Sequence, residues 1–238
     1  MIRTILMLSF WAVMLPITVI LCFPWTAITG DVRFLYHMGM WVSFNGVRIA
    51  GVRVKPVGLE KIDISRTYIF MSNHVSNIDP PLTLPLIPRR TSVMARHGLF
   101  KYPLLGWTMR QGDLVPVERE SGKGGLSAIR SAVEVLRKGL NLTIYVEGGR
   151  SFDGKLLRFK KGPFYLAEEC QVPVVPITIV GTHYVMPKGR FSMKAGEVQI
   201  IFHDPIEPKD FGDRELLMKK VRAALNSSLP AEMQEQPA

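Results

Sequence analysis

The chain is poor in cysteine and short of acidic residues for its size. Cys22 and Cys170 are the only cysteines among 238 residues, and they lie in unrelated sequence contexts. They predict neither a disulfide framework nor a metal site, which is typical of a reducing compartment. Lys and Arg number 30 against 20 Asp and Glu, a formal net charge of +10. This excess predicts an acidic partner: nucleic acid, an anionic lipid surface or a phosphorylated substrate.

Several catalytic and binding signatures are also missing. Without a Gly-x-Ser-x-Gly elbow, a serine hydrolase is disfavoured. Without a Walker loop or a Gly-x-Gly-x-x-Gly fingerprint, nucleotide chemistry is unsupported. The histidines other than His74 are scattered without metal-ligand spacing: His37, His97, His183 and His203. No RNA- or DNA-binding signature accompanies the basic charge. We therefore expect no metal and no nucleic-acid partner.

The N-terminal segment carries no charged residue from Thr4 to Gly30. That run exceeds the roughly 20 apolar residues that cross a bilayer core. A cleaved signal peptide is disfavoured, because the run is too long and no small-x-small site closes it. Two alternatives stay open: a single spanning helix, or a segment bent at Pro16 or Pro24 that returns through Phe34–Val47. Residues 1–58 are thus predicted to be a membrane-embedded helical anchor, with anionic membrane lipids as partners.

The remaining sequence alternates short apolar runs with helical periodicity, which predicts an α/β fold with a mostly parallel sheet flanked by helices. This second domain is expected over residues 59–230, followed by a frayed tail at 231–238. The expected strands are Tyr68–Met71, Thr91–Ala95, Asp113–Val117, Asn141–Val146, Val174–Val180 and Glu197–Phe202. The expected helices are Pro80–Leu86, Pro103–Gln111, Gly124–Lys138, Gly162–Cys170 and Asp213–Ser227.

One candidate for chemistry is the segment SNHVSNIDPP, which contains His74 and Asp79. On a continuous helix these side chains would point about 140° apart. A strand ending near Met71, a turn, and a helix starting near Pro80 would let them meet. An imidazole held by a carboxylate is a general base that can take a proton from an alcohol. The alternative is that Asp79 only caps the helix and His74 is a turn residue.

Two further segments carry an excess of positive charge. In YVEGGRSFDGKLLRFKKG, Tyr145 to Gly162, paired glycines allow backbone N–H groups to approach an anion, and Arg150 offers a bidentate fork for phosphate. Residues 80–112 contain no acidic residue, and their cations lie among apolar neighbours, as suits a lipid headgroup boundary or an acidic thioester carrier. The alternative for both segments is an ordinary solvated basic surface.

Four blocks, in this order, make the sequence resemble the glycerolipid acyltransferases, in particular the bacterial 1-acyl-sn-glycerol-3-phosphate acyltransferases. NHVSNID is similar to the family's Asn-His-x-x-x-x-Asp block, and HGLFKYPLLGWTMRQGDLVPVER to its second block. VEGGR is similar to the Pro-Glu-Gly-Thr-Arg block, and VPVVPI to the fourth. Four ordered blocks are far more specific than one, so the resemblance favours the catalytic interpretation of His74 and Asp79.

The resemblance implies a role for each matching residue. His74 would be the general base on the acceptor hydroxyl, and Asp79 its orienting partner. Arg119 and the run Glu147, Gly148, Gly149, Arg150 would bind the acceptor's phosphate, while Lys101 or backbone N–H groups would stabilise the oxyanion. Acyl-CoA or acyl carrier protein would donate the acyl chain, without metal or other cofactor, to a lysophospholipid. The product would be phosphatidic acid for phospholipid synthesis, made at the cytoplasmic face of a bacterial inner membrane.

Two departures from the family's pattern concern the acceptor. Val146 stands where the family usually has Pro, and Gly149 where it usually has Thr. The acceptor therefore stays open between lysophosphatidic acid and another lysolipid, such as lyso-ornithine lipid. Two other functions also stay open: a thioesterase with water as acceptor, and a peripheral lipid-binding protein without catalysis.

Overall fold

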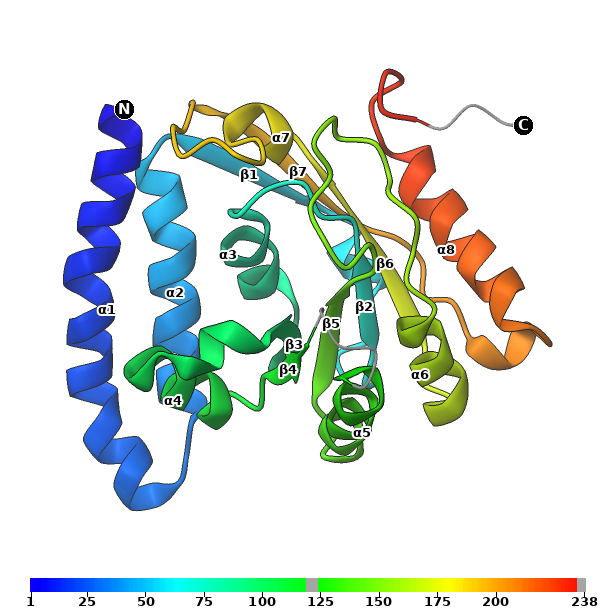
Figure 1. The fold of residues 1–238 in the computed structure, drawn as a ribbon, viewed down its shortest axis with the longest axis horizontal. Helices are drawn as coiled ribbons and strands as arrows, with labels where there is room; N and C mark the ends of the chain where they lie inside the picture. The colour runs from blue at the N-terminus through cyan, green and yellow to red at the C-terminus, as the bar shows by residue number, and fades with distance from the viewer. Residues whose placement is uncertain (119–123, 235–238) are drawn as a thin grey trace.

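The computed structural model describes residues 1–118 and 124–234, which form a helical hairpin and a sheet covered by helices (Figure 1). The strands are β1 (Val52–Val57), β2 (Ile69–Ser72), β3 (Thr91–Arg96), β4 (Val115–Val117), β5 (Asn141–Tyr145), β6 (Val174–Val180) and β7 (Gly196–Phe202). The helices are α1 (Ile2–Thr29), α2 (Arg33–Ile49), α3 (Asp79–Thr83), α4 (Pro103–Gln111), α5 (Gly124–Arg137), α6 (Gly162–Cys170), α7 (Thr182–Val185) and α8 (Arg214–Ser227).

The seven strands lie in the order β1-β7-β6-β2-β5-β3-β4. In the described part of the chain, β6 and β7 form the one antiparallel pair, and every other neighbouring pair is parallel. The expected mostly parallel α/β sheet is therefore confirmed. The carboxyl ends of β2, β5, β3 and β6 meet at one edge of the sheet, where open α/β sheets bind their ligands.

The two faces of the sheet have separate apolar cores. Ile69 and Met71 point from β2 into a core shared with α5, α6 and α8. Phe70, between them, points to the other face, where Val47 of α2 and Leu82 of α3 cover the sheet. This alternation is the period-2 pattern of a strand buried on both sides. The sheet is thus a rigid central layer between two layers of helices (Figure 1).

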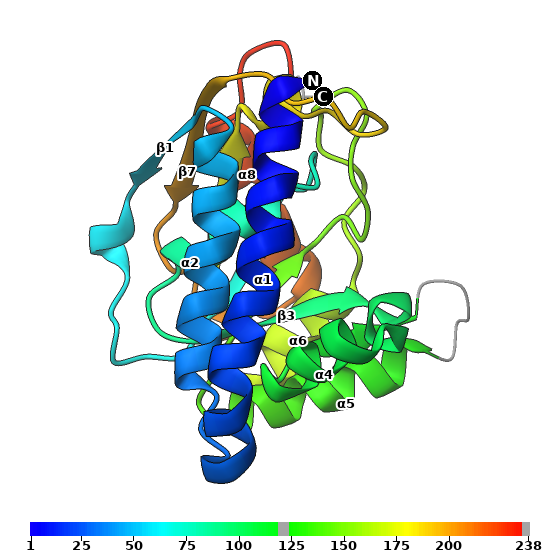
Figure 2. The same cartoon turned by 90° about the vertical axis from the view of Figure 1, so that its left-hand side faces the viewer.

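Helices α1 and α2 form an antiparallel hairpin along one side of the molecule (Figure 2). Trp11 Nε1 donates a hydrogen bond to the carbonyl of Val42, at 3.2 Å. The helices approach so closely at Gly46 that a Cβ atom there would lie 2.0 Å from Trp11 Nε1. By length and composition α1 is a candidate membrane span, and only 17% of its most apolar 18-residue stretch is buried inside the protein.

Of the two alternatives for the N-terminal segment, the one with a bend at Pro16 or Pro24 does not match the structure. Helix α1 runs through both prolines, and the chain turns only after Thr29, where Asp31 and Arg33 form a 2.7 Å ion pair. A proline removes one backbone donor, a loss that long apolar helices tolerate. The return through Phe34–Val47 is present as part of α2.

Both expected boundaries of the second domain require correction. The anchor was expected to extend to residue 58, but Val52–Val57 is the edge strand β1, paired with β7. The hairpin also shares a core with the sheet through Met7 and Val47, so it is not an independent domain. At the other end, Met233 is buried in the core and Glu232 bonds Tyr184, so residues 231–234 are not frayed. The rest of the expected frayed tail lies outside the described residues.

Candidate active site

Strand register brings two loops together at the carboxyl edge of the sheet. Ser72, the last residue of β2, lies opposite Tyr145, the last residue of β5. Two residues further along each chain segment come His74 and Glu147. The backbone N–H of His74 donates to Glu147 Oε1 at 2.8 Å. The first and third blocks of the sequence are thus joined by direct contact.

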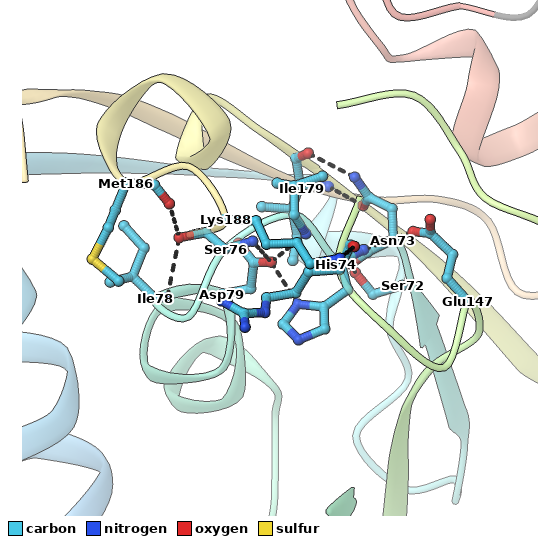
Figure 3. A network of polar contacts seen from close by, with 12 residues as sticks. Ser72, Asn73, His74, Ser76, Ile78, Asp79, Glu147, Ile179, Met186 and Lys188 are labelled. Atoms are coloured by element: carbon cyan, nitrogen blue, oxygen red, sulfur yellow. Dashed lines mark hydrogen bonds and ion pairs between the residues drawn. The ribbon is translucent and has the colours of Figure 1, made fainter. Parts of the chain in front are cut away.

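His74 and Asp79 form a hydrogen-bonded pair, with Nδ1 of His74 2.7 Å from Oδ2 of Asp79 (Figure 3). Asp79 is fully buried at the start of α3, and the His74 side chain is 14% exposed. The same Oδ2 accepts the backbone N–H groups of Val75 and Ser76, both at 2.8 Å. Because the loop folds back onto Asp79 instead of continuing as a helix, residues five apart meet.

Asn73, the first residue of the NHVSNID block, and Ser76 hold this loop in place, a role that the sequence analysis assigned to neither. The amide of Asn73 pairs with the backbone of Ile179: Nδ2 donates to its carbonyl at 3.0 Å, and Oδ1 accepts its N–H at 2.8 Å. Ser76 Oγ donates to the carbonyl of Met186 at 2.6 Å. Their partners lie more than 100 residues away, so no local pattern could have identified these roles.

Glu147 is 4% exposed, and both of its carboxylate oxygens are occupied by backbone donors. Oε1 accepts the N–H of His74, and Oε2 accepts the N–H of Leu157 at 2.7 Å. Burial raises the pKa of Glu147 to about 7, although the two N–H groups act in the opposite direction. This carboxylate is buried, and its negative charge would repel a phosphate. The expected direct contact between Glu147 and phosphate is therefore replaced by a structural link between two loops.

Gly148, Gly149 and Arg150 follow Glu147 directly in the loop after β5. Gly148 adopts a left-handed conformation, φ 68°, which a residue with a Cβ rarely adopts. Gly149 faces open space, and Arg150 is half-buried beside it. The carbonyl of Arg150 accepts a hydrogen bond from Lys188 Nζ at 2.7 Å.

The two remaining predicted site residues are not joined to this network. Lys101 is exposed at the end of the short 3-10 helix His97–Lys101, and no hydrogen bond or ion pair links it to His74 or Asp79 in the described part of the chain. Arg119 lies outside the described residues. Tyr145 is a further neighbour that the sequence did not indicate: its ring stacks on the imidazole of His74.

The sequence matches a known protein family and several known proteins. A family model described as acyltransferase matches residues 53–180. Two plant relatives are the chloroplast 1-acyl-sn-glycerol-3-phosphate acyltransferases BAT2 of Brassica napus, 36% identical over 63% of this chain, and LPAT1 of Arabidopsis thaliana, 32% identical over 82%. The chain spans about half the length of these relatives, 44% and 55%.

A solved structure extends the likeness to nearly the whole chain. The crystal structure of the 1-acyl-sn-glycerophosphate (LPA) acyltransferase PlsC from Thermotoga maritima matches with a TM-score of 0.79 at 28% identity. The match covers 94% of this chain and 93% of that one, so it includes both the hairpin and the sheet. The family model spans the His74–Asp79 pair and the Glu147–Arg150 loop, and on this ground the chain belongs to the acyltransferase family.

Proposed function

We propose that this protein is a 1-acyl-sn-glycerol-3-phosphate acyltransferase, which transfers an acyl chain from a thioester donor to lysophosphatidic acid and forms phosphatidic acid. The observation that carries the proposal is the 2.7 Å contact between His74 Nδ1 and the buried carboxylate of Asp79, within a fold shared with PlsC of Thermotoga maritima. The two plant relatives are 1-acyl-sn-glycerol-3-phosphate acyltransferases, which supports the same reaction for this protein.

The pair fits general-base chemistry on an alcohol. If Nδ1–H donates to Asp79, the lone pair of Nε2 is available to the acceptor hydroxyl. The hydroxyl oxygen attacks the thioester carbonyl carbon while Nε2 takes its proton. The tetrahedral intermediate then expels the thiolate, which recovers the proton from the imidazolium. The negative charge of Asp79 stabilises the imidazolium in between.

The acceptor's phosphate is expected to face the loop after β5. Arg150 supplies a cation there, and Arg119 and Lys101 stay predicted contributors to phosphate or oxyanion binding. In this proposal Glu147 does not bind the phosphate but has a positioning role. It fixes the backbone of His74 and the loop that carries Gly148, Gly149 and Arg150. The rigid link keeps the base and the phosphate site at a constant separation, which is what an oriented attack requires.

The membrane provides the natural location for such a reaction. We expect the α1–α2 hairpin to enter the bilayer, because most of the apolar surface of α1 is exposed. The formal charge of +10 favours an anionic lipid surface. The sheet, with His74 at its edge, would then work at the lipid–water boundary of a bacterial inner membrane, on its cytoplasmic face.

A test uses the full chain purified in detergent. Lysophosphatidic acid, lyso-ornithine lipid and other lysolipids are offered in turn, with acyl-CoA and with acyl carrier protein as donors. Formation of phosphatidic acid by the wild type, together with its loss in His74→Ala, is the expected result. Acylation of another lysolipid alone would contradict the acceptor assignment. Release of free fatty acid without acylated lipid would indicate a thioesterase, and lipid binding without any turnover would indicate a binding protein.

A further inference from the structure

A pocket lies at the carboxyl end of β6, the strand next to the β2 strand that precedes His74. Strands β2 and β6 are neighbours, so the loop after β2 and the loop after β6 emerge side by side. The loop after β6 lines a pocket of about 700 Å³ together with the start of β7. Small-molecule sites typically have volumes of about 300–1,000 Å³. The loop after β5 also contributes Phe152 to the pocket wall, so the pocket adjoins the segment that carries Arg150.

Two hydrogen bonds connect the pocket wall to the catalytic loops. Ser76 Oγ holds the carbonyl of Met186, and Lys188 Nζ donates to the carbonyl of Arg150 (Figure 3). Lys188 Nζ also lies 3.7 Å from the ring centroid of Phe152, another residue of the pocket wall. The pocket wall is therefore hydrogen-bonded to the loop that contains the His74–Asp79 pair and to the loop that carries Arg150.

The pocket is cationic and carries aromatic rings. Lys188, Arg190 and Lys194 line it, and neither Arg190 nor Lys194 forms an ion pair within residues 1–118 and 124–234. The one acidic residue of the wall, Glu197, is already paired with Lys55 at 2.9 Å. Phe152 is 70% exposed, with Lys188 Nζ over its ring, and Tyr184 is 51% exposed, with its hydroxyl donating to Glu232. Cations with exposed aromatic rings suit a phosphorylated aromatic ligand such as a nucleotide.

We propose that this pocket binds the phosphorylated nucleotide end of acyl-CoA. The inference rests on the proposed function and adds to it a location for the donor. The nucleotide of acyl-CoA would lie in this pocket, next to the loop that carries Arg150, and His74 at the end of β2 lies between the loops after β5 and β6. The flexible pantetheine arm then carries the thioester from the pocket to the imidazole.

The test compares two double variants that remove the same charge. Arg190→Ala/Lys194→Ala removes two cations of the pocket. Lys219→Ala/Lys220→Ala removes two exposed cations of α8, on the other face of the sheet, as the matched control. Each is assayed with acyl-CoA and with the acyl-pantetheine thioester, which lacks the nucleotide. We expect the pocket variant to raise the KM for acyl-CoA about ten-fold or more, with unchanged KM for acyl-pantetheine and for lysophosphatidic acid.

Adenosine 3′,5′-bisphosphate provides a probe that needs no turnover. It should bind the purified wild type in calorimetry, and the pocket variant at least ten-fold more weakly. Unchanged binding and an unchanged KM for acyl-CoA would overturn the proposal. A raised KM for lysophosphatidic acid would assign the pocket to the acceptor, and lost sedimentation with phosphatidylglycerol vesicles would assign it to the lipid surface. If the wild type transfers no acyl group but binds the probe, the proposed function fails while the pocket assignment stands.

Discussion

The imidazole of His74 lies against the phenol ring of Tyr145, with ring centroids 4.2 Å apart and planes inclined by 28°. Tyr145 ends β5, so the rigid sheet supports one face of the imidazole, while Asp79 holds its Nδ1 atom. Behind the pair, the Tyr145 hydroxyl, Thr83 Oγ1 and Asp79 Oδ1 are buried without a hydrogen-bond partner in the described part of the chain. Burial and the charge of Asp79 raise the pKa of Tyr145 well above its usual range.

Tyr145→Phe and Tyr145→Leu separate the ring from its hydroxyl. Tyr145→Phe keeps the stacked ring and removes an unpartnered buried hydroxyl, so we expect kcat within about three-fold of the wild type and no loss of stability. Tyr145→Leu removes the stacked ring. A stacked ring pair contributes about 0.5–1.5 kcal/mol, so we expect kcat to fall by as much as about ten-fold. Steady-state kinetics and thermal unfolding of both variants check this. Equal kcat values for the two would show that the ring has no part in positioning.

Asp79→Asn tests the carboxylate that holds the base. Oδ2 accepts three donors: the His74 ring and the backbone N–H groups of Val75 and Ser76. A carboxamide has one accepting atom and no negative charge to stabilise an imidazolium. We expect kcat to fall by about a thousand-fold, near the contribution of a general base. A silent substitution, measured in the same detergent and at the same lipid concentration, would contradict general-base catalysis and favour a lipid-binding protein.

Glu147 makes stability depend on pH. Its pKa is about 7 in the folded protein against the ordinary 4.5, so the folded state binds its proton more tightly than the unfolded state. The extra stability is therefore complete below about pH 4.5 and is lost as the pH rises through about 7. The loss amounts to at most about 3 kcal/mol. Unfolding followed from pH 4.5 to 8 should show this decline in the wild type.

Glu147→Gln supplies the comparison for that decline. Its amide cannot ionise, so the pH-dependent component should disappear between pH 4.5 and 8. The variant should also be less stable than the wild type at pH 4.5, since one of the two backbone N–H groups of His74 and Leu157 then meets an NH₂ group. Parallel pH curves for the two proteins would argue against the raised pKa.

Gly46→Ala tests the close contact within the hairpin. The added Cβ would meet the Trp11 ring at 2.0 Å, so the α1–α2 contact must open, and we expect a loss of about 1–3 kcal/mol in stability. Gly39→Ala is the matched control, because it lies in the same helix with no atom within 4 Å of its added Cβ. It should be neutral or stabilising by up to about 1 kcal/mol. Thermal unfolding in detergent, followed by tryptophan fluorescence, distinguishes the two.

Arg150→Ala tests the expected site for the acceptor's phosphate. The variant should raise the KM for lysophosphatidic acid, or lower kcat/KM for it, and leave the KM for the thioester nearly unchanged. Arg130→Ala, an exposed cation of α5, controls for the loss of one positive charge. A selective effect on thioester use would instead show that Arg150 contacts the donor.

Sequence periodicity located every strand of the described sheet except the edge strand β1. Strands such as Val174–Val180 are buried runs of β-branched residues, so their pattern is local and recognisable. β1 was missed because its sequence, VRVKPV, mixes cations and a proline with valines, a composition tolerated only at an edge. The same lack of local signal hid Asn73 and Ser76, whose partners Ile179 and Met186 are supplied by β6 and the loop that follows it.

The sequence alone predicted the α/β class, the apolar N-terminus and the candidate site residues His74, Asp79 and Arg150, because these predictions depend on composition, periodicity and short motifs. Only the tertiary structure decided that Glu147 links two loops, that the hairpin turns after Thr29, and that a cationic pocket lies beside β6. Those features depend on which strands are neighbours and in which register. Register is set by how side chains far apart in the chain fill one core, and no local segment of sequence contains that information.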